Sequence, residues 1–127
     1  MVLSLGANGL GLLSIPSARL RHLHGIDGGL ALDAAFRDPN SLASDQQGNV
    51  YVAEAANNRI RKIDTNGIVT TIAGNGEHAD SGDGGSALKA GIRSMDDIAF
   101  SPEGELHILG TNTHKVRKIT KGGKIVT

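Results

Sequence analysis

The chain has 127 residues, no cysteine, and 13 acidic and 13 basic residues, which give it no net charge. These figures exclude a disulfide framework and a thiolate metal site, and they remove the electrostatic attraction on which most binding to nucleic acid or anionic membranes depends. Aromatic residues make up only 2% of the chain and Trp is absent, so a core has to be built from Ile, Leu, Val and Ala.

Residues 1–26 form an unmatched N-terminal segment. Its apolar runs at 2–5 and 10–13 have the character of a secretory signal, with small residues at 16–18 as a cleavage site. However, Gly6, Asn8 and Gly9 interrupt these runs and no basic residue precedes them. We therefore favour the remnant of a preceding repeat over a signal peptide.

The segment from Asp27 to Thr71 is repeated from Asp83 to Thr127 with a period of 56 residues. The two copies are identical at 14 of 45 aligned positions. A repeat of this length predicts one supersecondary unit that is copied and stacked, because such a unit buries its apolar surface only against its neighbours. We assign repeat 1 and its following loop to residues 27–82. Repeat 2 occupies residues 83–127, and its fourth strand is cut short.

Each repeat opens on Asp-Gly-Gly, a turn sequence in which the carboxylate can accept backbone N–H groups while the glycines adopt positive φ. The predicted structural loop consists of Asp27, Gly28, Gly29, Asp83, Gly84 and Gly85. Apolar residues four apart follow it, at Leu32 and Phe36 and at Leu88 and Ile92. This spacing predicts one or two helical turns, with Ser86 as the N-cap of the second.

Four strands are expected in each repeat, separated by connections rich in Gly, Asn and Asp. The expected strands span 41–44, 50–53, 59–63, 68–73, 97–100, 106–109, 115–119 and 124–127. Bulky residues on both faces of the second strand predict cover from two sides, and Tyr51 is expected to pack within its blade. Four short antiparallel strands with one long loop make a propeller blade. The predicted fold class is all-β, with two four-stranded antiparallel blades of an incomplete propeller.

Repeat 1 resembles the NHL-repeat family in its segments 39–45, 48–54, 57–63 and 71–76. Residues 81–88 resemble the long glycine-rich inter-blade loop of larger NHL blades, as in many bacterial propellers and in teneurin ectodomains. The resemblance implies an NHL-type β-propeller, commonly of about six blades. It also favours an extracytoplasmic or secreted location, without fixing the compartment.

Repeat 2 departs from the family pattern. Gly110 stands where repeat 1 has Glu54, Met95 replaces Pro39, and Thr-His-Lys at 113–115 replaces Asn-Asn-Arg. Any pairing between the acid and the arginine of a blade is therefore not carried over to repeat 2.

Two blades cannot close a ring, because a propeller sheet needs neighbours on both faces. Three explanations stay open: a fragment of a longer protein, assembly from several copies, or a decayed gene product. The end of the chain inside an expected strand favours a fragment. We therefore expect a need for further blades in cis or for self-association.

The expected function is a non-enzymatic interaction module that binds a protein partner, without a catalytic residue, cofactor or metal. Basic residues recur at equivalent positions of the two repeats and form the predicted interaction surface: Arg59, Arg61, Lys62, Lys115, Arg117 and Lys118. The alternative for these residues is pairing with blade carboxylates such as Glu54 or Asp64.

Other functions are weighed against this one. A resemblance to the propeller of the amidating lyase implies a metal-dependent lyase or hydrolase, but the spacing of His78, His107 and His114 places no pair of them on one metal. TRIM-type NHL proteins bind RNA, yet neutral charge and few aromatics make nucleic acid an unlikely partner here. Asp80 and Asp83 could offer oxygen ligands to Ca²⁺, although turn capping is favoured. No apolar run has the length of a membrane span.

Overall fold

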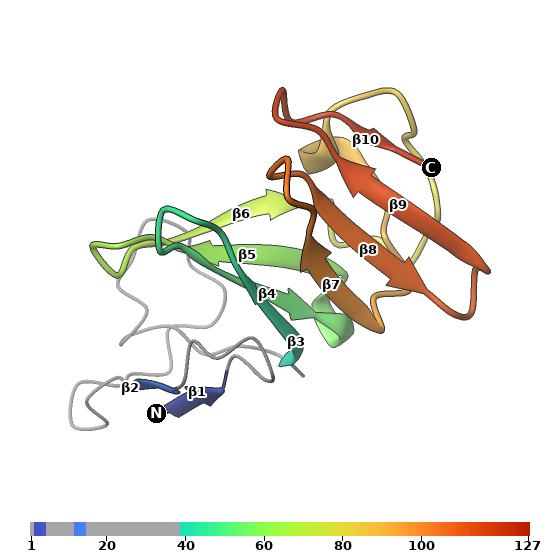
Figure 1. Cartoon of the computed structure of the whole chain (residues 1–127). Coiled ribbons are helices and arrows are strands. Elements are labelled where there is room, and N and C mark those ends of the chain that lie inside the picture. The colour runs from blue at the N-terminus through green and yellow to red at the C-terminus, as the bar shows by residue number, and fades with distance from the viewer. Residues whose placement is uncertain (1, 5–11, 15–38) are drawn as a thin grey trace.

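The computed structural model describes residues 2–4, 12–14 and 39–127. Two four-stranded antiparallel sheets make up most of this part, and each keeps its strands in chain order (Figure 1). Blade 1 consists of β3 (Pro39–Ser44), β4 (Val50–Glu54), β5 (Arg59–Ile63) and β6 (Val69–Ala73). Blade 2 consists of β7 (Asp97–Phe100), β8 (Leu106–Gly110), β9 (Lys115–Ile119) and β10 (Ile125–Val126). The predicted all-β fold with two antiparallel four-stranded units is confirmed.

A further antiparallel pair is formed by β1 (Val2–Ser4) and β2 (Leu12–Ser14). The rest of the N-terminal segment 1–26 lies outside the described residues. The same holds for the turn at Asp27, Gly28 and Gly29 and for the helical turn expected at 31–36, so these expectations stay predictions.

The turns of the two blades match in backbone conformation even where their side chains differ. Gly48 and Gly104 occupy the β3–β4 and β7–β8 turns with φ of +90° and +85°. Asn58 and His114 lie one period apart at the next turns and adopt φ of +52° and +54°. A side chain with a β-carbon adopts this region only at some cost, which turn geometry imposes in both copies. The period of 56 residues is therefore a period of structure as well as of sequence.

The two sheets lie face to face, with β7 beside β3 (Figure 1). Alternate residues of the strands point into the space between them. Small alanines of blade 1 meet branched side chains of blade 2 in this core, which lets the sheets pack without aromatic rings at its centre. The core consists of Ala43, Ala53, Ile60, Ala73, Ala87, Ala90, Ile92, Met95, Ile98, Leu106, Ile108, Ile119 and Ile125.

The inter-blade loop, residues 74–96, runs from β6 at one edge of blade 1 to β7, the strand of blade 2 that lies beside β3. It contains the short 3₁₀ helix η5 (Ala87–Lys89), which begins after Ser86. The Ser86 hydroxyl accepts a hydrogen bond from the Leu88 N–H at 3.3 Å, so the predicted N-cap is confirmed. The predicted helical face is wrong, because η5 ends at Lys89 and buries Ala87 instead. Leu88 is 51% exposed whereas Ile92 is buried.

The blades differ in their second face. In blade 1 Val52 and Val69 are fully buried on the side away from blade 2, so both faces are covered as predicted. In blade 2 Leu109 and Val116 are 43% and 52% exposed. The sequence predicts that both faces of β4 and of β8 are covered. This prediction is wrong for β8, because one of its faces is exposed in the described part of the chain.

Candidate interaction site

The predicted interaction surface is divided by strand alternation. Arg61 and Arg117 point into the blades and are 0% and 4% exposed. Their buried guanidinium groups are not accessible to a partner protein, so neither arginine forms part of the predicted interaction surface. The four other members reach solvent to differing extents: Arg59, Lys62, Lys115 and Lys118.

Glu54 neutralises Arg61 inside blade 1. Arg61 Nη1 lies 3.1 Å from Glu54 Oε1, and the two side chains are 1% and 0% exposed. This ion pair confirms the carboxylate pairing considered for Arg61. Asp64, the other carboxylate considered, instead accepts hydrogen bonds from the N–H groups of Asn66 and Ile68, both at 2.9 Å, and so holds the β5–β6 turn.

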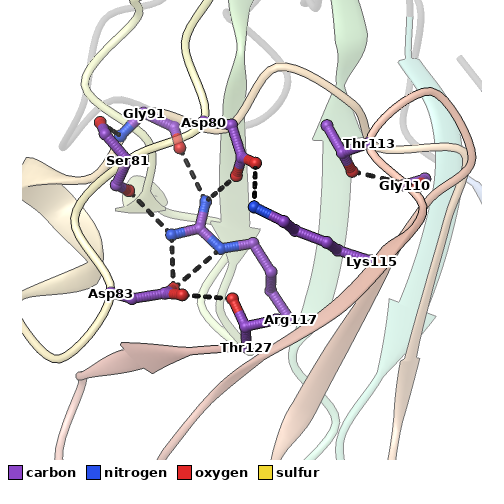
Figure 2. A network of polar contacts seen from close by, with 9 residues as sticks. All are labelled: Asp80, Ser81, Asp83, Gly91, Gly110, Thr113, Lys115, Arg117 and Thr127. Carbon is purple, nitrogen blue, oxygen red and sulfur yellow. Dashed lines mark hydrogen bonds and ion pairs between the residues drawn. The ribbon is translucent and has the colours of Figure 1, made fainter.

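Arg117 of blade 2 takes its carboxylates from the inter-blade loop (Figure 2). Its Nε and Nη2 donate to Asp83 Oδ1 at 3.1 Å and 2.8 Å, and its Nη1 lies 3.3 Å from Asp80 Oδ1. The same guanidinium donates to the carbonyls of Ser81 and Gly91, both at 2.8 Å. One side chain from β9 thereby binds four residues of the loop and fastens it to the blade.

No side chain could supply the missing acid from position 110. An ideal β-carbon on Gly110 would lie 2.6 Å from Thr113 Oγ1 and 3.0 Å from the Ser94 carbonyl oxygen. Thr113 occupies that space because its hydroxyl donates to the Gly110 carbonyl at 3.1 Å. In blade 1 the acid that pairs with the buried arginine lies on the neighbouring strand, whereas in blade 2 two acids of the inter-blade loop pair with it.

Further contacts hold the two loop carboxylates in place. Lys115 Nζ lies 2.6 Å from Asp80 Oδ2, and the Thr127 hydroxyl donates to Asp83. Hydrogen bonds from Thr127 and from Arg117 lower the pKa of Asp83 below its usual value. The predicted turn-capping role of Asp83 is thus wrong, since its carboxylate binds side chains. Of the two glycines that follow it, Gly84 has the expected positive φ of +86° and Gly85 does not. In the described ranges no three His, Asp or Glu side chains are grouped so as to hold a metal ion.

Replacing Arg117 with lysine should release the inter-blade loop, because one ammonium cannot reproduce a planar group that serves two carboxylates and two carbonyls. We expect faster amide hydrogen exchange at residues 81–91 of the full chain, measured by mass spectrometry. Lys115→Gln is the matched control, since it removes only a half-exposed partner of Asp80 and a pair of this kind contributes little. Equal exchange in the Arg117→Lys variant and the parent chain would contradict this role.

A cleft of about 1230 Å³ opens between the blades at their hairpin ends. Tyr51 and Phe100 line it from opposite blades, with ring centroids 4.8 Å apart in an edge-to-face arrangement. The Tyr51 hydroxyl donates to Asp45 Oδ2 at 3.0 Å. Burial, together with this hydrogen bond, raises the pKa of Tyr51. Tyr51 thus has a packing role, as predicted, but its ring contact is with the other blade, and it also lines a cleft that the sequence does not predict.

The three histidines considered for catalysis have separate surroundings. His78 belongs to the inter-blade loop, and its Nδ1 lies 3.4 Å from Asn58 Oδ1. His107 Nδ1 lies 3.0 Å from the Glu105 carbonyl oxygen on β8, and His114 is exposed at the β8–β9 turn. None of these contacts joins one histidine to another.

Comparison with known proteins finds a family match. Residues 9–83 match the family model described as the Teneurin NHL domain. Mouse Teneurin-1 is 28% identical over 105 residues, which cover 72% of this chain and 4% of that protein. Protein SUPPRESSOR OF QUENCHING 1, chloroplastic, from Arabidopsis thaliana is 35% identical over 96 residues, covering 72% of this chain and 9% of that protein. The chain therefore spans a small part of these relatives.

Solved structures show the same blade arrangement. A protein of unknown function from Bacteroides thetaiotaomicron superposes with a TM-score of 0.64 and 32% identity, over 73% of this chain and 23% of that chain. A streptogramin B lyase superposes with a TM-score of 0.54 and 15% identity, over 72% of this chain and 26% of that chain. The second likeness is one of fold alone. The two sheets are thus blades of a β-propeller.

Proposed function

Because the chain belongs to the Teneurin NHL domain family, we propose that it is a non-enzymatic module for contact between proteins, built from two NHL-type propeller blades. The division into repeats at 27–82 and 83–127 and an extracytoplasmic location are parts of this proposal. The described part of the chain contains no helix long and apolar enough to cross a membrane.

The observation that supports the proposal is an exposed apolar face on blade 2. Ala53 and Ile60 of blade 1 are fully buried against blade 2. One period later, Leu109 and Val116 occupy the same positions in blade 2 and are 43% and 52% exposed. Since equivalent positions of stacked repeats make equivalent contacts, this face is a seat for another blade of the same kind. In a solution of the isolated chain, the uncovered blade face is the same face of a second copy, because both faces of blade 1 are covered.

The oligomeric state tests this proposal. We expect the full chain to self-associate in sedimentation velocity experiments, and the double variant Leu109→Glu, Val116→Glu to sediment as a monomer, because it places charges on the contact face. Leu88→Glu is the matched control, since Leu88 is 51% exposed on the inter-blade loop and lies off this face. A parent chain that stays monomeric at the concentrations used, or a Leu88 variant that dissociates equally, would contradict the proposal.

The two alternative functions, a metal-dependent lyase or hydrolase and an RNA-binding propeller, have less support. The likeness to a streptogramin B lyase concerns the fold alone, and in residues 39–127 no three potential ligand side chains are grouped for a metal ion. For RNA binding, burial of Arg61 and Arg117 removes two of the six recurring cations. We therefore keep the interaction module as the proposed function.

A further inference from the structure

The space between the two sheets is filled with side chains at the end near the inter-blade loop. At the other end, where the hairpin turns lie, it is open and forms the inter-blade cleft. Ala87, Ala90 and Ile92 of the inter-blade loop enter the core and close its loop end. Within residues 39–127 the blades are connected only by this loop, and Tyr51 and Phe100 line the cleft at the hairpin end. The apolar part of the cleft wall is completed by Ile72, Leu106 and Ile119.

Two lysines of the cleft are available to a ligand. Lys62 of blade 1 and Lys121 of the β9–β10 turn line the opening, and neither forms an ion pair or a side-chain hydrogen bond within the described part of the chain. Lys118, by contrast, is held by Glu105 at 3.1 Å. The cleft thus offers two unpaired ammonium groups, one from each blade.

The two acidic residues that line the cleft, Asp45 and Glu103, differ in how far their carboxylate oxygens are engaged in hydrogen bonds. Asp45 accepts hydrogen bonds from the N–H groups of Gln47 and Asn49, from the Asn49 side chain and from the Tyr51 hydroxyl. Burial opposes ionisation of Asp45, but these hydrogen bonds outweigh it and lower its pKa. Both of its oxygens are engaged in holding the turn. Glu103 is exposed on the β7–β8 turn and is the acid that would compete with an anionic ligand.

We propose that the inter-blade cleft binds an acidic peptide segment of a protein partner, an inference that rests on the proposed interaction function and deepens it. Carboxylates of the segment pair with Lys62 and Lys121, and an apolar side chain between them packs against Tyr51 and Phe100. The volume of about 1230 Å³ exceeds the range of about 300–1,000 Å³ typical of small-molecule pockets and suits a stretch of chain.

Fluorescence anisotropy with a labelled peptide tests this site in the full chain. The probe is Glu-Phe-Asp-Leu-Glu-amide with the fluorophore on its N-terminus, and its basic counterpart carries Lys in place of each acid. We expect the acidic probe to bind and the double variant Lys62→Gln, Lys121→Gln to bind it about tenfold more weakly, since each exposed pair contributes up to about 1 kcal/mol. Glu103→Gln should tighten binding by about twofold to threefold for the same reason.

Lys124→Gln is the matched control, because Lys124 is exposed on the same β9–β10 turn but does not line the cleft. Its affinity should equal that of the parent chain. The inference is overturned if the acidic probe does not bind, if the basic peptide binds more tightly, or if Lys124→Gln weakens binding as much as the double variant. Self-association that disappears in the Leu109→Glu, Val116→Glu variant would still support the proposed function in each of these cases, so the two failures are distinguishable.

Discussion

Replacing Glu54 with alanine should lower the free energy of unfolding by about 3–5 kcal/mol. The substitution removes a carboxylate 3.1 Å from Arg61 Nη1 and leaves the guanidinium inside blade 1, where its side chain is 1% exposed. Loss of one partner is costly because the remaining charge stays desolvated. Urea denaturation of the full chain, followed by circular dichroism, measures the change.

The double variant Glu54→Leu, Arg61→Met is the control for this prediction. It removes both charges and fills the space with apolar side chains, and replacements of this kind are often neutral or stabilising. We expect it to recover most of the stability lost in Glu54→Ala. If the double variant is as unstable as the single one, the loss comes from packing and the ion-pair explanation is wrong.

The second large effect is expected at Gly74, where β6 meets the inter-blade loop. An ideal β-carbon on Gly74 would lie 2.2 Å from the Asn58 carbonyl oxygen and 2.9 Å from Arg59 Cα, and its φ is +91°. These neighbours are backbone atoms, and the Gly74 N–H is itself bound to the Ala87 carbonyl at 2.9 Å. Gly74→Ala should therefore lower the free energy of unfolding by roughly 2–5 kcal/mol through strain and overpacking together.

Gly67→Ala separates these two causes. Gly67 has a similar φ of +81°, but an added β-carbon would meet no atom within 4 Å. This variant should lose only about 1–2 kcal/mol through backbone strain. Thermal unfolding of both variants measures the difference, and equal losses would show that the close approach at Gly74 has no energetic consequence.

Much of the fold could be predicted from the sequence because its signals are local. Alternating side chains and glycine-containing turns predicted β5, β7 and β9 with the bounds that the structure shows. Other ends differ by a residue or two, as at β3, which begins at Pro39, and β4, which extends to Glu54. These ends depend on how far each strand pairs with its neighbour, which a single strand's sequence does not specify.

The partners of the repeated side chains could not be predicted in the same way. Arg61 and Arg117 occupy equivalent positions, yet one binds an acid on its own blade and the other binds acids more than 30 residues away in the chain. The inter-blade cleft and the exposed face of blade 2 likewise involve residues from separate strands and turns.

The amino-acid sequence by itself determined the repeat, the strand order and the turn conformations, because hydrogen bonding in a hairpin and the alternation of side chains act between residues close in the chain. Only the tertiary structure decided which arginine is fastened to which carboxylate, which blade face stays exposed and where the cleft opens. Those outcomes depend on the element that lies opposite each side chain, and the two copies of the repeat have different neighbours.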